Sequence, residues 1–408
     1  MKIIVLAGGL CPERDVSISS GSLIANALIE NGHEVFLLDL YEGAKIRRPM
    51  EDIFVSANSN KRYSYLVPEN EPDLVALKAK VDNGDALIGK NVIELCQYAD
   101  IVFIALHGDI GENGKLQAIF DAHGVKYTGT GYVGSLLAMD KDLSKQIVRS
   151  NGILTSDWIL LKTSMEGSGE PSNSVGGTAA KCAASDSGSK CCVATISTAT
   201  GSSSVGSRAE LICTMSGGKG SLIGEFAQCV SDAVDSIGFP CVVKPMSCGS
   251  SVGVSIVRNE KELYDAIAIA KKYEDTLIVE KYIKGREFSV GVLANKPLPP
   301  IEIIPKGGFY DYANKYQKGW ADEICPARLS DDVTLEIQSV ALRIHNILRL
   351  GDYSRIDFIM DNRESAFFLE ANTLPGMTPT SLLPQEAAAY GVPYNELCEK
   401  IVRIALVT

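Results

Sequence analysis

Residues 353–372 read YSRIDFIMDNRESAFFLEAN, and this stretch decides the fold of the last part of the chain. Positions 353–360 alternate apolar and polar side chains as a β-strand does. Positions 361–365 are turn residues, and positions 366–372 return as a second strand. The pattern therefore predicts an antiparallel β-hairpin.

Four polar side chains share one face of this predicted hairpin. If position 361 pairs with 366, Asp357 lies opposite Glu370 and Arg355 lies opposite Asn372, with Cβ atoms about 5 Å apart. Two carboxylates and an amide oxygen suit Mg²⁺ that carries nucleotide phosphates, and Arg355 suits phosphate or a developing oxyanion. On residue types alone, an ordinary ion pair on a solvated sheet face is the more frequent arrangement.

A small-residue loop follows a second buried strand and strengthens the functional interpretation. Residues 244–253, KPMSCGSSVG, begin with Lys244 at the end of an apolar run. Glycine lets the backbone approach a phosphate, and Ser hydroxyls and backbone amides donate to it. A plain turn with exposed glycines is the alternative. The lysine at the strand end favours a phosphate-binding loop.

A third strand, LIVEKYI at residues 277–283, leads to Glu287. Backbone groups exposed at the end of such a strand can bind a purine, and a carboxylate just beyond it can accept from ribose hydroxyls. In isolation, a strand with a charged exit is the simpler interpretation. Together with the loop and the hairpin, the strand indicates a nucleotide site.

Composition restricts the class of protein. The 408 residues carry a formal net charge of −11, and the pI is about 5.0. Such an acidic chain is not expected to bind nucleic acid or an anionic membrane. No apolar run approaches the roughly 18 residues of a membrane span, and the start of the chain is interpreted as a strand rather than a signal peptide. We therefore expect a cytoplasmic protein with reduced cysteines.

Strands and helices alternate at the beginning of the chain. Strands are expected at 2–7, 34–39 and 101–106, with a helix at about 17–30. This order predicts an α/β domain with a parallel sheet, whose functional residues gather at the carboxyl ends of the strands.

The middle of the chain has a different composition. Residues 164–220 hold thirteen Ser and ten Gly. A stretch of this kind buries little apolar surface, so we interpret about 164–230 as a flexible insertion. Farther on, periodic apolar residues predict helices at 331–350, capped by Asp331, and at 394–406.

The motifs together resemble the ATP-grasp ligases and, within them, the D-alanine–D-alanine ligase family. The resemblance covers most of the chain outside about 42–98 and 164–230. The matching stretches are 13–17, 105–108, 111–114, 127–131, 139–141, 249–253, 309–312, 315–316, 355–357, 370–373 and 375–378.

The resemblance implies an α/β (α+β) ATP-grasp fold. A Rossmann-like parallel-sheet domain at 1–130 would be followed by two α+β lobes that sandwich ATP, a central lobe at 131–281 and a C-terminal lobe at 282–408. It also implies that two D-alanines are joined through an acyl phosphate, with ADP and phosphate released, for peptidoglycan synthesis. A homodimer is expected.

The resemblance also implies roles for individual residues. Two Mg²⁺ (or Mn²⁺) ions would be bound by Asp357, Glu370 and Asn372. ATP would be bound by Lys141, Lys244, Glu280, Lys281, Ile283, Glu287 and Lys315. Catalysis would involve Glu13, Ser250, Tyr316, Arg355 and the Gly376 amide. The D-alanines would be contacted by His107, Ser381 and Leu382.

Some features leave alternatives open. Residues 310–317 fit a lid that shields the acyl phosphate. In the phosphate loop, Met246, Ser247 and Cys248 stand where many members of the family carry charge. A ligase that makes D-alanyl-D-lactate or D-alanyl-D-serine is one alternative, and Tyr316 disfavours the lactate form. A non-catalytic nucleotide-binding ATP-grasp protein is another. The 164–220 stretch would serve as an interaction segment in a third.

Overall fold

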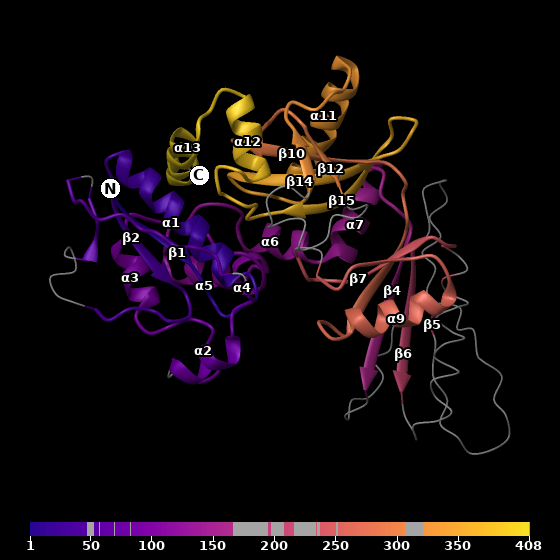
Figure 1. Cartoon of the computed structure of the whole chain (residues 1–408), viewed down its shortest axis with the longest axis horizontal. Helices are drawn as coiled ribbons and strands as arrows, with labels where there is room; N and C mark the ends of the chain where they lie inside the picture. Colours follow the sequence, from indigo (N-terminus) through magenta and orange to yellow (C-terminus); the bar gives the residue numbers. More distant parts are fainter. Residues whose placement is uncertain are drawn as a thin grey trace.

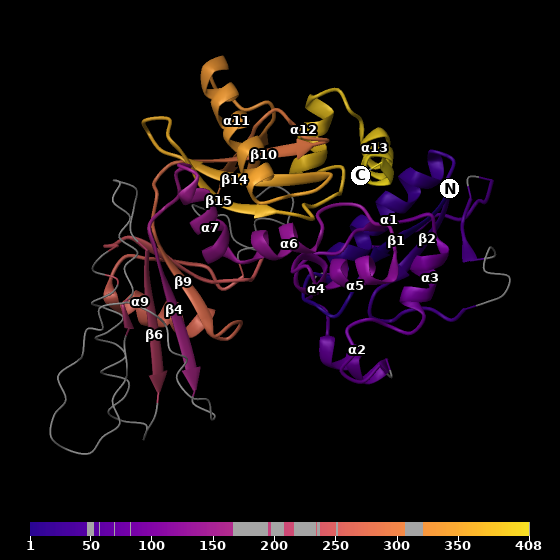
Figure 2. The ribbon, with the colours of Figure 1, turned by 180° about the vertical axis from the view of Figure 1, so that it is seen from behind.

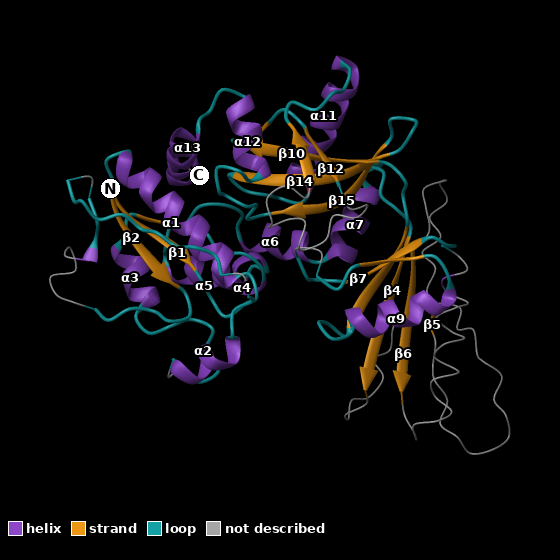
Figure 3. Cartoon of the chain, viewed as in Figure 1, coloured by secondary structure: helices purple, strands orange, loops and turns teal. Residues whose placement is uncertain are grey.

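The computed structural model describes residues 1–46, 53–56, 58–68, 70–81, 83–165, 195–196, 208–215, 234, 237–249, 252–306 and 321–407. Three sheets organise the chain (Figures 1 and 3), and each belongs to a different part of the sequence.

The first sheet is parallel, as the sequence predicts. Its strand order is β2-β1-β3, and its strands are β1 (Lys2–Ala7), β2 (Glu34–Asp39) and β3 (Ile101–Ile104). The helices of this part are α1 (Arg14–Glu30), α2 (Leu74–Lys80), α3 (Val92–Tyr98), α4 (Asp109–Glu112) and α5 (Lys115–His123). Helix α1 begins at Arg14, earlier than expected, and Gly32 follows it with a φ of +88°.

The central sheet has the order β5-β6-β4-β9-β7-β8. Its strands are β4 (Trp158–Met165), β5 (Thr195–Ile196), β6 (Arg208–Met215), β7 (Cys241–Pro245), β8 (Ser255–Val257) and β9 (Thr276–Lys281), and its helix is α9 (Glu260–Ala270). Strand β6 pairs with β4 in parallel along its whole length. Strands β5 and β6 lie within 164–220, the stretch that its composition led us to interpret as a flexible insertion, so these two segments of it pair in the central sheet. The sequence of β6, RAELICTM, contains no Gly or Ser, unlike the stretch around it.

The C-terminal sheet is antiparallel, with the order β13-β12-β10-β14-β15 and β11 paired to β10. Its strands are β10 (Arg286–Leu293), β11 (Lys296–Pro297), β12 (Ile301–Pro305), β13 (Ala321–Ile324), β14 (Tyr353–Met360) and β15 (Ala366–Asn372). The helices are α11 (Asp331–Ile347), α12 (Leu382–Ala389) and α13 (Tyr394–Val407). Ser330 rather than Asp331 caps α11, because its hydroxyl accepts from the Val333 amide at 3.4 Å.

The first and last parts of the chain share one hydrophobic core. Side chains of α12 and α13, among them Leu383, Leu397 and Ile401, pack with the first sheet. The ring of His33 lies 2.6 Å from the Glu399 carboxylate and joins the two parts. The central sheet has a separate core, and in Figure 2 it projects away from the rest.

Two helices connect the first sheet to the other two. Helices α6 (Tyr132–Met139) and α7 (Lys141–Ser150) contact β15, and Ala138 and Val148 belong to the core of the C-terminal sheet. This packing places the start of α7 between the central and C-terminal sheets. The predicted domain boundaries at 130 and 281 stay predictions.

Candidate active site

The hairpin β14–β15 gathers its four polar side chains as predicted. Asp357 pairs with Glu370 and Arg355 pairs with Asn372. The pairing of position 361 with 366 is wrong, because Met360 pairs with Ala366 and a bulge between Asp357 and Phe358 shifts the register by one. The bulge adds one residue to β15 and so restores the predicted register at the polar end.

Asp357 is at the centre of a hydrogen-bonded network. Its carboxylate accepts from Arg355 Nε and Nη2 at 2.9 and 2.8 Å, from Asn372 Nδ2 at 2.9 Å, and from Ser289 Oγ at 2.9 Å. Burial alone would lower the pKa of Arg355, but the Asp357 carboxylate raises it above its usual value. The guanidinium therefore stays charged.

Lys141 joins this network to the phosphate-loop candidate. Its Nζ lies 3.7 Å from Glu370 Oε2 and donates to the Cys248 carbonyl at 2.7 Å. Asp140 caps α7 by accepting from the Leu143 amide at 2.8 Å, which fixes Lys141 at the first helical position. The lysine ammonium thus lies between a predicted metal ligand and the loop.

A second buried ion pair fixes the end of β9. Lys244 Nζ lies 2.8 Å from Glu280 Oε1, while Lys145 Nζ lies 3.4 Å from Glu280 Oε2. Burial would raise the pKa of Glu280, but the two lysines lower it to about 2. Sequence reasoning missed Lys145. The signal was present, because Lys141 and Lys145 are four residues apart and share a helix face.

Most of the residues assigned to ATP and metal line one cavity of about 160 Å³ between the central and C-terminal sheets. Its walls combine charged and apolar groups, as nucleotide sites do. From the predicted sets, the lining includes Lys141, Lys244, Glu280, Lys281, Ile283, Glu287, Asp357 and Glu370.

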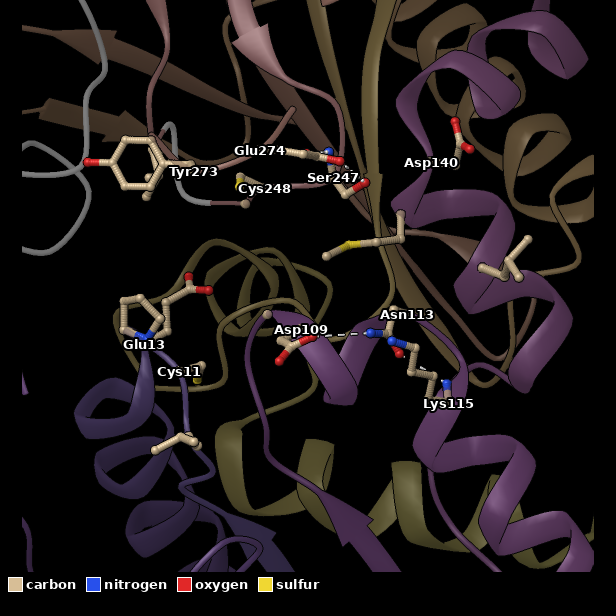
Figure 4. Close-up of a pocket in the computed structure, with 17 residues that line it drawn as sticks. Cys11, Glu13, Asp109, Asn113, Lys115, Asp140, Ser247, Cys248, Tyr273 and Glu274 are labelled. Atoms are coloured by element: carbon tan, nitrogen blue, oxygen red, sulfur yellow. Dashed lines mark hydrogen bonds between the residues drawn. The ribbon is translucent and has the colours of Figure 1, made fainter. Parts of the chain in front are cut away.

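Glu13 lies in a second cleft, of about 610 Å³ (Figure 4). The cleft runs between the first sheet's loops and the phosphate-loop candidate, with Ser247 and Cys248 across from Glu13. A Cβ on Gly108 would lie 2.6 Å from Glu13 Oε2, and one on Gly249 would lie 3.9 Å from it. The carboxylate is therefore packed against glycine backbone. A small cavity lined by Lys141, Gly249 and Glu370 shares these residues with the two larger ones.

Two partly buried titratable groups lie next to Glu13. Burial lowers the pKa of His107, against the opposing effect of Glu13. Burial, helped by Glu13, raises the pKa of Glu112 to about 7, and its Oε2 accepts from the Gly108 amide at 2.7 Å. Glu112 lies in the matching stretch 111–114, but its position beside Glu13 was not predicted from the sequence.

The start of α12 supplies the last part of the site. Ser381 Oγ lies 3.1 Å from the Thr378 amide, and a Cβ on Gly376 would lie 2.9 Å from it. Leu382 opens the helix. Free amides at a helix N-terminus favour a carboxylate.

The donor set fits divalent cations that also bind phosphate. Among the described residues, no group of three or more His, Cys, Asp or Glu could hold a metal. Asp357, Glu370 and Asn372 provide two carboxylates and one amide, all oxygen donors, and Mg²⁺ in such sites takes its remaining ligands from phosphate and water. Ser250, Lys315, Tyr316 and the predicted lid at 310–317 lie outside the described residues.

A mixed central sheet and an antiparallel C-terminal sheet face each other across a cavity, with lysines on one side and a carboxylate hairpin on the other, and this arrangement defines an ATP-grasp ligase. Family models described as D-ala D-ala ligase N-terminus and D-ala D-ala ligase C-terminus match residues 2–130 and 221–403. The chain belongs to the D-alanine–D-alanine ligase family.

Individual relatives agree with this assignment. The D-alanine–D-alanine ligase of Pediococcus pentosaceus is 38% identical over 98% of this chain and 97% of its own. The fold is similar to that of the Bacillus anthracis D-alanine–D-alanine ligase complexed with ATP, with a TM-score of 0.64, 24% identity and coverage of 100% of this chain and 98% of that one. It is also similar to the VanG D-Ala:D-Ser ligase of Enterococcus faecalis, with a TM-score of 0.64, 23% identity and coverage of 99% of each chain.

Proposed function

We propose that this chain joins two D-alanines to D-alanyl-D-alanine in an ATP-dependent reaction that supplies peptidoglycan synthesis. The observation that carries the proposal is the position of the β14–β15 hairpin. Its cluster of Arg355, Asp357, Glu370 and Asn372 lies where the nucleotide cavity meets the cleft that contains Glu13.

The reaction has two steps. The carboxylate of the first D-alanine attacks the γ-phosphorus of ATP, and the bond to the bridging oxygen of ADP breaks to leave an acyl phosphate. The amine of the second D-alanine, after losing a proton, attacks the acyl carbon, and phosphate leaves. Such transfers depend on positioning and on positive charge near the phosphoryl oxygens, which fits the arrangement of lysines and Arg355.

Each group of cavity residues would bind the part of ATP that lies nearest to it. Lys141 and Lys244 lie near the phosphate loop and would neutralise the phosphates. The end of β9, with Glu280, Lys281 and Ile283, would hydrogen-bond the adenine through backbone groups, and Glu287 on β10 would accept from the ribose. Two Mg²⁺ or Mn²⁺ ions on Asp357, Glu370 and Asn372 would supply further charge neutralisation when bound.

The D-alanines would bind on either side of the transferring phosphoryl group. Glu13 would accept from the first ammonium, and His107 would lie near the first carboxylate. Ser381 and Leu382, at the start of α12, would hold the second carboxylate. Arg355 and the Gly376 amide would stabilise the tetrahedral intermediate.

Several parts of the proposal concern residues or states beyond the described structure. Ser250 and Tyr316 are predicted to form a hydrogen-bonded set with Glu13, and Lys315 is predicted to reach the transferring phosphate. A homodimer and a cytoplasmic location also stay predictions. Within the described part of the chain, no helix combines the length and apolar character needed to cross a bilayer.

The test compares second substrates. Purified protein with ATP, Mg²⁺ and D-alanine should release phosphate and form a product with the mass of D-alanyl-D-alanine. D-lactate or D-serine, offered in equal amount beside D-alanine, should enter the product less often. Absence of dipeptide with all three components present would refute the proposal, and preferential D-lactate or D-serine incorporation would establish the corresponding sister ligase. Glu370→Gln should abolish turnover without changing the thermal melt.

A further inference from the structure

The Asp357 carboxylate has all its hydrogen-bonding positions occupied by the protein. Oδ1 accepts from Ser289 Oγ and from Arg355 Nε, each at 2.9 Å. Oδ2 accepts from Arg355 Nη2 at 2.8 Å and from Asn372 Nδ2 at 2.9 Å. A carboxylate offers about four lone-pair positions. A divalent cation can therefore bind Asp357 only after one of these donors has moved.

Of the three residues that donate to Asp357, Arg355 is the one that we expect a cation to displace. Its guanidinium carries a positive charge and covers both oxygens that the cation requires, and like charges repel strongly in a partly buried site. Ser289 and Asn372 are neutral, and Ser289 is fully buried on β10. Occupation of Asp357 thus requires a second place for the Arg355 guanidinium.

Glu386 provides a buried carboxyl group that lacks a side-chain hydrogen-bond partner. Its side chain is fully buried beneath α12. Neither of its carboxyl oxygens has a side-chain hydrogen-bond partner within the part of the chain that the structure describes. Burial raises the pKa of Glu386 well above its ordinary value, and the Arg355 guanidinium and the Gly291 backbone oppose this effect. Buried polar groups are almost always hydrogen-bonded, so an exception of this kind requires an explanation.

The sheet register places Glu386 beside Arg355. Gly291 of β10 pairs directly with Arg355 of β14, so both positions face the same side of the sheet. A Cβ on Gly291 would lie 2.5 Å from Glu386 Oε2. The Glu386 carboxyl group therefore occupies the space that a larger residue at 291 would fill, on the face that carries Asp357.

We propose that Glu386 is a positioning residue that receives the Arg355 guanidinium when a divalent cation binds Asp357. The inference rests on the proposed function only in placing a cation on Asp357. With the cation bound, the Glu386 carboxyl group releases its proton and accepts from the Arg355 guanidinium, so that each buried charge has a partner. Because Glu386 belongs to the helix that begins with Leu382, the pair also fixes Arg355 relative to the predicted site of the second carboxylate.

Manganese binding tests the proposal without any substrate. Mn²⁺ alone is titrated into the full-length protein, and free Mn²⁺ is measured by electron paramagnetic resonance. Glu386→Gln should weaken Mn²⁺ binding by roughly tenfold or more, the value of one hydrogen bond to a charged group. Arg355→Met should tighten it, since no guanidinium then competes for Asp357. In the Arg355→Met background, Glu386→Gln should change nothing.

Three further variants keep the result interpretable. Glu386→Met replaces the carboxyl with an apolar group of similar length and should weaken Mn²⁺ binding as Glu386→Gln does, even if the latter folds poorly. Glu323→Gln is the matched control. Glu323 is a partly buried acid whose pKa Arg355 also influences, but it already accepts a hydrogen bond from Gln385, so its loss should leave Mn²⁺ affinity unchanged. Asp357→Asn gives the background binding.

Each contrary outcome overturns the proposal. An equal effect of Glu386→Gln in both backgrounds would mean that Glu386 does not act through Arg355. No effect in either background would mean that it only fills space beneath α12. If the wild-type protein binds Mn²⁺ no more strongly than Asp357→Asn does, the cation does not bind Asp357. None of these measurements uses ATP or D-alanine. A failure of the proposed ligase function would therefore be distinguishable from a failure of the proposed role of Glu386.

Discussion

The ammonium of Lys145 lies 3.4 Å from Oε2 of Glu280, and neither side chain exposes more than 4% of its surface. Lys145 also donates to the hydroxyls of Thr155 and Ser156 at 2.8 Å. Burial lowers the pKa of Lys145 to about 8, although Glu280 opposes this effect. This buried lysine connects helix α7 to the end of β9, where we propose that adenine binds.

Replacing Lys145 with Met should destabilise the protein and weaken ATP binding. Breaking a buried pair costs about 3–5 kcal/mol when the remaining charge is left alone, and Lys244 still neutralises part of Glu280, so we expect the lower end of that range. Denaturant unfolding and ATP titration measure the two effects. Lys78→Met is the control, because the Lys78–Asp85 pair is exposed and should contribute no measurable stability. Equal stability of the two variants would contradict this account.

The buried side chain of His345 should make the free energy of unfolding decrease at acidic pH. Its Nδ1 lies 2.8 Å from Ser354 Oγ, and burial lowers the pKa of His345 from 6.5 to about 4. The unfolded chain therefore binds a proton at a higher pH than the native protein does. The contribution of neutral His345 to the free energy of unfolding is complete above pH 6.5. It is lost as the pH falls towards 4, and the loss is at most about 3 kcal/mol.

The measurement is urea unfolding at a series of pH values. His345→Gln should flatten the decline between pH 6.5 and 4, whereas His123→Gln, at an exposed helix end, should not change it. A wild-type stability that stays constant over this range would refute the prediction.

Gly108→Ala should impair use of the first D-alanine. Gly108 has a φ of +64°, and a Cβ there would lie 2.6 Å from Glu13 Oε2. Displacing a positioning group by about 1 Å can reduce kcat/KM by roughly 10²-fold. Gly124→Ala is the matched control, since its φ is +67° and nothing lies within 4 Å of its Cβ position. Gly124 has a ψ of 23° and is left-handed, so Gly124→Ala should lose about 1 kcal/mol of stability. Gly108 has a ψ of 179°, in a region that is essentially restricted to glycine, so Gly108→Ala should lose roughly 1–3 kcal/mol. Only Gly108→Ala should lose activity. Full activity in Gly108→Ala would show that the position of Glu13 does not matter for substrate binding.

Glu274 should determine the position of the phosphate-loop candidate. Its two oxygens accept from the Ser247 amide at 2.7 Å and from the Ser247 hydroxyl at 3.0 Å. Loss of both bonds in Glu274→Ala should raise KM for ATP by roughly tenfold, with a smaller effect on KM for D-alanine. Glu262→Ala removes a comparable pair of hydrogen bonds at the other end of α9, to Arg258 and Asn259. An equal change in KM for ATP in both variants would show a general loss of stability instead.

The sequence predicted the local geometry of the hairpin well, because alternation and turn residues act over short distances. The predicted pairing of Arg355 with Asn372 is present because the bulge in β15 offsets the one-residue error in the register at the turn. The bulge in β15 did not follow from the pattern. It lies next to a long-range bridge between Phe368 and Thr155, whose hydroxyl donates to the Phe368 carbonyl at 2.9 Å.

Long-range relationships were not predictable from one sequence. The core that α13 shares with the first sheet joins Ile401 to Ile3, residues almost a whole chain apart. Glu386 was overlooked because a single acid in an apolar helix has no local signal of burial. The resemblance supplied the roles of the site residues, and the register and cavity linings show which of them lie together.

The central claim is that a carboxylate of D-alanine attacks ATP to form an acyl phosphate. It is tested most directly with D-alanine whose carboxyl group carries ¹⁸O, incubated with the protein, ATP and Mg²⁺. The attacking oxygen stays on phosphorus when the amine of the second D-alanine displaces the phosphate, so each released phosphate should contain one ¹⁸O, detected by mass spectrometry or by the isotope shift in its ³¹P resonance. Release of unlabelled phosphate together with dipeptide would contradict the mechanism.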